Sequence, residues 1–151
     1  MCGFLDLQRA ALIRKIEGVS DADARKAPTA SSLSLLGLLK HSALSERRWF
    51  QVVAAGRTFP GEWPERRSSG MAEDFLLDDQ DTVERWVACY QEQVAMSREI
   101  TAGMELDAGC ARPDLADRNL RWVLLHLSEE TARHAGHADI IRQTLDGSRG
   151  I

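Results

Sequence analysis

Helical periodicity extends over most of this 151-residue sequence. Apolar residues recur at steps of three and four, and no stretch alternates apolar and polar residues as a half-buried strand does. Clusters of glycine, proline and serine divide the periodic segments into four long helices, each with one apolar stripe. Four such helices bury their stripes most simply in a four-helix bundle. We therefore predict an all-α protein and expect residues 1–151 to form a single domain.

Capping residues define the expected limits of these helices. They span residues 4–18, a second segment from 31–34 to about 56, residues 82–100, and residues 119–146. Gly147 fits the position just beyond the end of the last helix. Residues 20–23 favour one short helical turn, and residues 57–80 are predicted to be a loop. A loop of that length in a compact domain is often functional.

Composition excludes several classes of protein. The chain has 19 Lys and Arg against 23 Asp and Glu, a net charge of −4 with neutral histidines, so we expect no nucleic-acid or anionic membrane partner. No apolar run approaches the ~20 residues of a membrane span, and the N-terminal residues lack the features of a signal peptide. Three cysteines without CxxC spacing argue against a disulfide framework. We expect a cytoplasmic protein.

Four ionisable side chains interrupt the apolar stripe of the last helix. At about 100° per residue, His126, Glu130, His134 and His137 share one face with apolar residues, while a charged face lies opposite. Burying such groups costs several kcal/mol unless they pair with one another or bind a metal. This face is therefore the strongest functional signal in the sequence.

The remaining histidine, His41, lies on the core-facing stripe of the second helix. A bundle that packs this stripe against the last helix brings His41 toward Glu130 and His134, which are one turn apart. Two imidazoles and one carboxylate suit Zn, Fe or Ni, and three protein ligands leave open positions for water or substrate. We predict a catalytic divalent metal at these three residues, with zinc expected and nickel or iron as alternatives.

One other interpretation of the polar residues stays open. The histidines and Glu130 also fit a buried hydrogen-bond network in which Arg48 takes part. We expect Arg48 and Trp63 to contact a small-molecule substrate, and Trp63 is placed in the long loop as a pocket wall. Common motifs for nucleotide binding or nucleophilic hydrolysis are absent from the sequence.

Two stretches carry a resemblance to a known family. SLSLLGLLKHSALSERRWF (residues 32–50) and LRWVLLHLSEETARHAGHADIIRQTLDG (residues 120–147) resemble the DinB/YfiT-like superfamily of metalloenzymes, closest to its actinobacterial branch of mini-circle proteins. Mycothiol-dependent maleylpyruvate isomerase and the bacillithiol and mycothiol S-transferases are related to that branch. The resemblance implies a four-helix bundle, a homodimer and a divalent metal held by His41, Glu130 and His134.

The sequence departs from the commonest pattern of this superfamily, which has histidine where Glu130 stands. A glutamate there is similar to the maleylpyruvate isomerase, whose zinc site has two histidines and one glutamate. That enzyme has an additional C-terminal domain that residues 1–151 do not include, so we do not expect its activity here. His126 and His137 are extra to the triad and fit the roles of ligand partner, proton carrier or substitute ligand.

The resemblance implies a thiol S-transferase or a thiol-dependent isomerase. A metal would favour the thiolate of a low-molecular-weight thiol, which is the nucleophilic form. His137 or His126 would move protons, because an imidazole titrates near neutral pH. The alternatives are a metal-dependent hydrolase that activates water, and a bundle without catalytic activity that binds a ligand.

Overall fold

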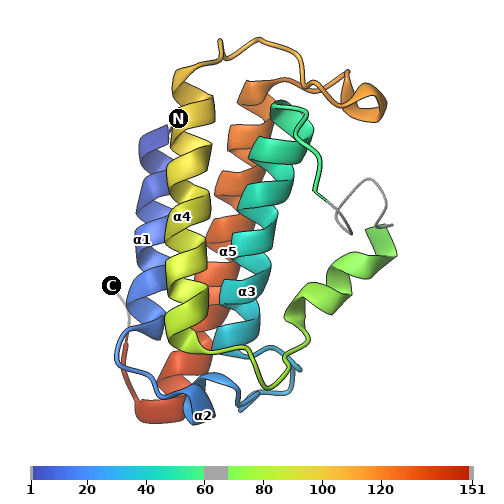
Figure 1. Cartoon of the computed structure of the whole chain (residues 1–151). Helices are drawn as coiled ribbons and strands as arrows, with labels where there is room; N and C mark the ends of the chain where they lie inside the picture. The colour runs from blue at the N-terminus through green and yellow to red at the C-terminus, as the bar shows by residue number, and fades with distance from the viewer. Residues whose placement is uncertain (1, 60–67, 150–151) are drawn as a thin grey trace.

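The computed structural model describes residues 2–59 and 68–149, and over those ranges it contains helices but no β-strand. Four long α-helices make up most of it (Figure 1): α1 (Cys2–Ile16), α3 (Leu35–Glu46), α4 (Val83–Ala102) and α5 (Leu120–Asp146). The shorter elements are α2 (Asp21–Ala24), the π-helix η1 (Arg47–Ala54), and the 3-10 helices η2 (Ser68–Phe75) and η3 (Pro113–Leu115). The predicted all-α class is confirmed.

The long helices form a bundle in which α1 and α5 run in one direction and α3 and α4 in the other (Figure 1). The closest packing is of α1 along α5 and of α3 along α4. A tight turn cannot join the parallel helices α3 and α4, because the chain must first return along the length of the bundle. This return explains the long connection between them, and it brings η2 against α3.

Three of the predicted N-caps are observed. Ser34, Thr82 and Asn119 each accept a hydrogen bond from the backbone N–H three residues later, at 3.1, 3.2 and 3.0 Å. Gly147 ends α5 with a φ of 78°, a left-handed conformation that glycine adopts without strain. The short turn after Ser20 is present as α2. The prediction of a loop over residues 57–80 is wrong in part, since η2 lies within it.

The second predicted helix is not α-helical throughout. Its last part is the π-helix η1, in which the chain makes hydrogen bonds to the fifth residue back, such as Ala55 N–H to the Phe50 carbonyl at 3.0 Å. Inside the bundle, the Gln51 side chain donates to Gln93 of α4 at 2.7 Å. Wide turns of this kind occur often at functional sites. Here η1 carries Arg48, which donates to Asp74 of η2, and Trp49, whose ring meets that of His126 of α5.

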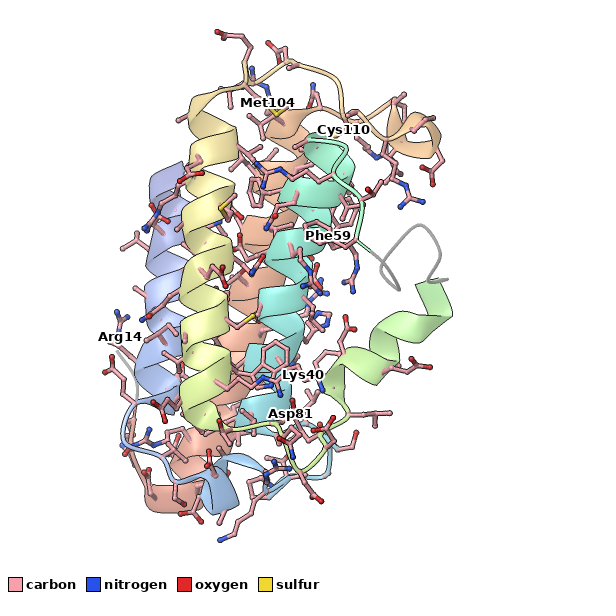
Figure 2. The ribbon with its side chains drawn as sticks, viewed as in Figure 1. Arg14, Lys40, Phe59, Asp81, Met104 and Cys110 are labelled. Atoms are coloured by element: carbon pink, nitrogen blue, oxygen red, sulfur yellow. The ribbon has the colours of Figure 1, made fainter. Side chains whose placement is uncertain are left out.

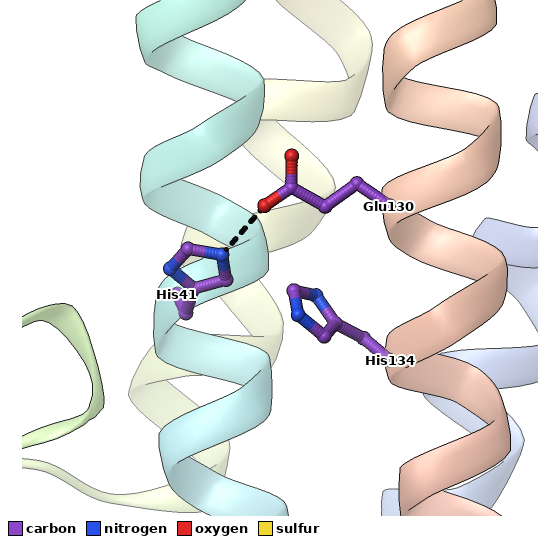
Figure 3. Close-up of side chains that lie close together, drawn as sticks. All are labelled: His41, Glu130 and His134. Carbon is purple, nitrogen blue, oxygen red and sulfur yellow. Dashed lines mark hydrogen bonds and ion pairs between the residues drawn. The ribbon is translucent and has the colours of Figure 1, made fainter. Parts of the chain in front are cut away.

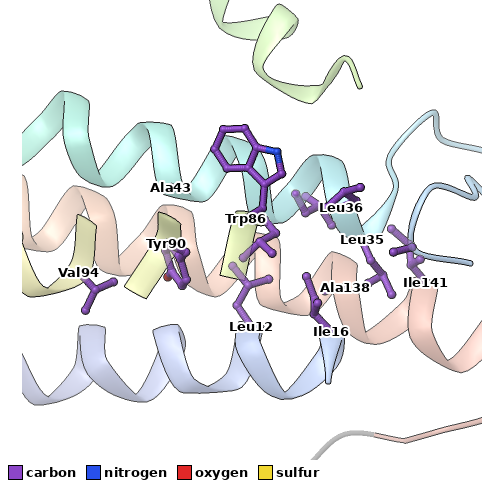
Figure 4. Packing of buried hydrophobic residues seen from close by; sticks show 13 residues of the cluster. Leu12, Ile16, Leu35, Leu36, Ala43, Trp86, Tyr90, Val94, Ala138 and Ile141 are labelled. Atoms are coloured by element: carbon purple, nitrogen blue, oxygen red, sulfur yellow. The ribbon is translucent and has the colours of Figure 1, made fainter. Parts of the chain in front are cut away.

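The core consists of two apolar clusters with a polar layer between them. One cluster surrounds Leu12, Tyr90 and Ile141 (Figure 4), and the other surrounds Leu5 and Phe50. The polar layer is made by three side chains at intermediate positions of α1, α3 and α4, namely Arg9, Glu46 and Ser97.

No described helix is both long and apolar enough to cross a membrane.

Asp81 connects the start of α4 to α3. Its carboxylate accepts hydrogen bonds from Lys40 Nζ at 2.9 Å, from Trp86 Nε1 at 2.6 Å and from the Asp78 N–H at 2.8 Å (Figure 2). The residue is only 2% exposed. Burial raises the pKa of Asp81, but the three hydrogen bonds and the Lys40 charge outweigh it, so this pKa lies below its usual 3.8.

We expect Asp81→Asn to lower the free energy of unfolding at pH 7 by about 1–3 kcal/mol, because an amide cannot accept all three bonds as an anion does. A depressed pKa contributes stability that is complete above the unfolded value and is lost as the pH falls through the folded value. Urea unfolding of the two proteins should therefore converge below pH 3.8. Asp107→Asn is the control, since the Asp107 side chain is 76% exposed and its loss should change little. Equal stability of Asp81→Asn and wild type at pH 7 would contradict the prediction.

Candidate metal centre

Three of the predicted site residues meet at the interface of α3 and α5. His41 comes from α3, and Glu130 and His134 come from successive turns of α5 (Figure 3). Their candidate ligand atoms all lie within 4.8 Å of one another, and His41 Nε2 is 3.0 Å from Glu130 Oε1. The imidazole rings of His41 and His134 meet edge to face, with 4.8 Å between their centroids. This group can bind a metal ion.

The donor atoms fit a small divalent ion. Tetrahedral ligands at about 2.1 Å from a metal are roughly 3.4 Å apart, so the separations need to shorten by at most about 1.4 Å, which side-chain rotation can supply. His134 makes no hydrogen bond to the residues described. Burial, together with the nearby charge of His41, lowers the pKa of His134 to about 4. His134 is therefore neutral at pH 7 and has a lone pair available for a metal.

Glu130 is ionised and oriented from both sides. While His41 approaches one carboxylate oxygen, His126 Nε2 lies 3.0 Å from the other. Burial raises the pKa of Glu130, but hydrogen bonds from His126 and His41 outweigh it and hold the pKa well below its usual value. The ring of His126 stacks on Trp122 at 4.9 Å and meets the edge of Trp49 at 4.4 Å. The structure thus places His126 behind Glu130, with its ring in contact with both Trp49 and Trp122.

His137 lies beside the group of three rather than in it. Its ring centroid is 6.2 Å from that of His134, and its Nδ1 is buried with no hydrogen-bond partner among the residues that the structure describes. It lines a cavity of about 290 Å³ between α5 and the segment that precedes α3. Leu33, Ile140 and Ile141 give this cavity largely apolar walls.

The structure adds one residue that the sequence analysis missed. Asp74 of η2 lies behind His41, with Oδ2 at 3.4 Å from His41 Nδ1, and it accepts a hydrogen bond from Arg48 Nη2 at 2.8 Å. Burial lowers the pKa of His41, but the carboxylates of Asp74 and Glu130 outweigh it and raise the pKa above 6.5. Phe75 stacks on the His41 ring, with centroids 4.3 Å apart.

These contacts bear on the two predicted substrate residues. Arg48 is 2% exposed and reaches Asp74, so it takes part in a buried network as one interpretation of the sequence allowed. Its contact with substrate stays a prediction. Trp63 lies outside the described residues. Helical periodicity could not identify Asp74 as a site residue. Its position beside His41 depends on how the long connection between α3 and α4 returns past α3.

Comparison with known proteins decides the family. The model of the mycothiol-S-transferase family matches residues 1–147 of this chain. The chain belongs to the mycothiol S-transferase family. This agrees with the resemblance to DinB/YfiT-like proteins that residues 32–50 and 120–147 carry.

A solved structure supports the fold of this family member. The crystal structure of a protein described as the conserved protein of locus from Enterococcus faecalis has a TM-score of 0.66 to the chain at 13% identity. The similarity covers 97% of this chain and 95% of that chain. At this identity it shows the fold alone. None of the curated proteins matches the chain.

Proposed function

We propose that this protein is a divalent-metal-dependent transferase that activates a low-molecular-weight thiol of the mycothiol type toward a small electrophile. The observation that carries the proposal is the convergence of His41, Glu130 and His134 in a member of the mycothiol S-transferase family. Three protein ligands leave positions open for a substrate, as in catalytic rather than structural sites. Zinc is the proposed ion, because the set of two imidazoles and one carboxylate suits it, with nickel or iron as alternatives.

When bound, the ion would stabilise the thiolate, which is the reactive form of a thiol. Two of the three candidate ligands are already in the protonation state that metal binding requires. His134 is neutral at pH 7 and Glu130 is ionised, so two of the three donors need not lose a proton first. His126 restrains the carboxylate of Glu130 from the side away from His41.

Transfer breaks the S–H bond and forms a bond from sulfur to the electrophile, while the electrophile's leaving group, or its opened ring or double bond, takes the displaced electron pair. The thiol proton needs an acceptor. His137 is the better placed of the two extra histidines, because His126 is already bonded to Glu130, whereas His137 Nδ1 has no partner within the described part of the chain. The cavity beside His137 offers about 290 Å³ with apolar walls, which suits an electrophile with an apolar body.

Thiol binding can be tested directly with cobalt in place of zinc. Titration of the Co²⁺-loaded protein with mycothiol should produce a sulfur-to-metal charge-transfer band, because a coordinated thiol is deprotonated. His41→Ala is the matched variant and should give no band. A protein that binds Co²⁺ and hydrolyses esters or amides without responding to the thiol would favour the hydrolase. A protein that binds no divalent ion would leave only the non-catalytic alternative.

Formation of a homodimer stays a prediction of the family resemblance.

A further inference from the structure

Asp74 contacts the proposed metal centre from outside the four-helix bundle. The three candidate ligands come from α3 and α5, whereas Asp74 belongs to η2, in the connection between α3 and α4. Asp74 is 1% exposed, so its carboxylate is buried at a cost that only charged or hydrogen-bonding partners offset. Arg48 and His41 are among its partners, and both approach the same oxygen, Oδ2.

Several contacts fix η2 and the residue after it against α3. Lys40 Nζ donates to the Leu76 carbonyl at 2.8 Å, and the ring of Phe75 covers one face of His41. Gly37 permits this approach, because a Cβ there would lie only 3.0 Å from the Phe75 carbonyl oxygen. The carboxylate of Asp74 is therefore held in place by α3 itself, the helix that carries His41.

The two ring nitrogens of His41 face opposite sides. Nε2 faces Glu130 and the candidate metal site, whereas Nδ1 is buried without a hydrogen bond to the described residues and lies 3.4 Å from Asp74 Oδ2, slightly beyond the usual hydrogen-bonding distance. A histidine that binds a metal normally donates its other N–H to a carboxylate or carbonyl, which fixes the tautomer and the ring orientation. Asp74 occupies that position for His41. His134 has no corresponding partner among the described residues.

We propose that Asp74 is a positioning residue of the metal centre: it accepts the Nδ1–H of His41 so that the Nε2 lone pair points at the ion, and Arg48 holds Asp74 in place. The inference rests on the metal site proposed above but not on the thiol-transfer reaction. A carboxylate that accepts the N–H of a metal-binding imidazole makes that imidazole more basic and also fixes its orientation. Loss of Asp74 should therefore weaken metal binding while all three ligands remain.

The test is the zinc dissociation constant, measured by competition with a chromophoric chelator. Asp74→Ala removes the acceptor and should weaken zinc binding by about 10- to 100-fold. Asp74→Asn keeps an oxygen that can accept from His41 but loses the charge, so its dissociation constant should lie between those of Asp74→Ala and wild type. If the alanine variant does not fold, the nearly isosteric asparagine variant carries the test alone, with an affinity below that of wild type.

Asp81→Asn is the matched control. Asp81 is also a buried aspartate bonded to α3, through Lys40, but it makes no contact with His41. The Asp81→Asn variant should therefore have a lower melting temperature in the metal-free form and an unchanged zinc dissociation constant. Zinc affinity of both Asp74 variants equal to that of wild type would overturn the inference, and so would an equal loss of affinity in Asp81→Asn. Wild-type protein that binds no zinc would instead overturn the proposed metal site and this inference together.

Discussion

Replacing His134 with alanine should abolish stoichiometric zinc binding, and replacing His41 should do the same. Each change leaves only two of the three donors, one imidazole and the Glu130 carboxylate. We expect the dissociation constant to rise more than about 100-fold, beyond the effect of removing a hydrogen-bond partner of a ligand. Elemental analysis of the purified proteins and chelator competition measure this directly. In His41→Ala the two neighbouring carboxylates keep other described partners, Glu130 with His126 and Asp74 with Arg48, so we expect the metal-free proteins of both variants to remain folded.

His137→Ala is the control for these variants, because it removes a histidine one turn further along the same helix. It should retain zinc and reduce thiol-dependent turnover, as expected for a proton acceptor beside the site. Loss of zinc as complete as in His134→Ala would make His137 a ligand and contradict the assignment of the three donors. A variant that keeps both zinc and turnover would make His137 structural and reject its role in proton transfer.

The convergence of His41 with Glu130 and His134 was predictable once the second helix was expected to pack against the last one, because helical periodicity places all three residues on core-facing stripes. Residues spaced by four lie on one face whatever their neighbours, and caps such as Ser34 and Asn119 set where those faces begin. An ionisable residue on an apolar face must then meet a partner from the facing helix. The four helices and the faces that carry the three candidate ligands follow from these two local rules.

Asp74 and the π-helix were not predictable by the same rules. Asp74 reaches His41 only because α3 and α4 are parallel, so that their connection returns along α3. No local pattern encodes that path. The change from α- to π-helix at Arg47 has no signal in the sequence either, since its residues have ordinary helical periodicity. It nevertheless decides where Arg48 and Trp49 lie relative to Asp74 and His126.

A second large effect is expected in the polar layer between the two apolar clusters. Arg9 donates to both oxygens of Glu46, from Nε at 2.8 Å and from Nη2 at 2.7 Å, and Ser97 donates to Glu46 at 2.7 Å. Arg9 is 6% exposed and Glu46 is 1% exposed. Arg9→Met keeps most of the side-chain volume but leaves the Glu46 carboxylate with Ser97 as its remaining described partner. We expect the free energy of unfolding to fall by about 3–5 kcal/mol, the usual cost of removing one partner of a buried ion pair.

Arg98→Met is the control for this variant, because Arg98 bonds Asp6 at 3.0 Å, as Arg9 also does, but its side chain is 59% exposed. It should change the free energy of unfolding by less than about 0.5 kcal/mol in urea titrations. The double variant Arg9→Met with Glu46→Leu should recover most of the stability, since a buried pair replaced by apolar groups of similar volume is often neutral. In that variant the Ser97 hydroxyl would donate its one hydrogen to the Gln93 carbonyl, 2.9 Å away, instead of to Glu46. A double variant no more stable than Arg9→Met would attribute the loss to packing of the arginine stem and contradict the explanation by an unpaired buried charge.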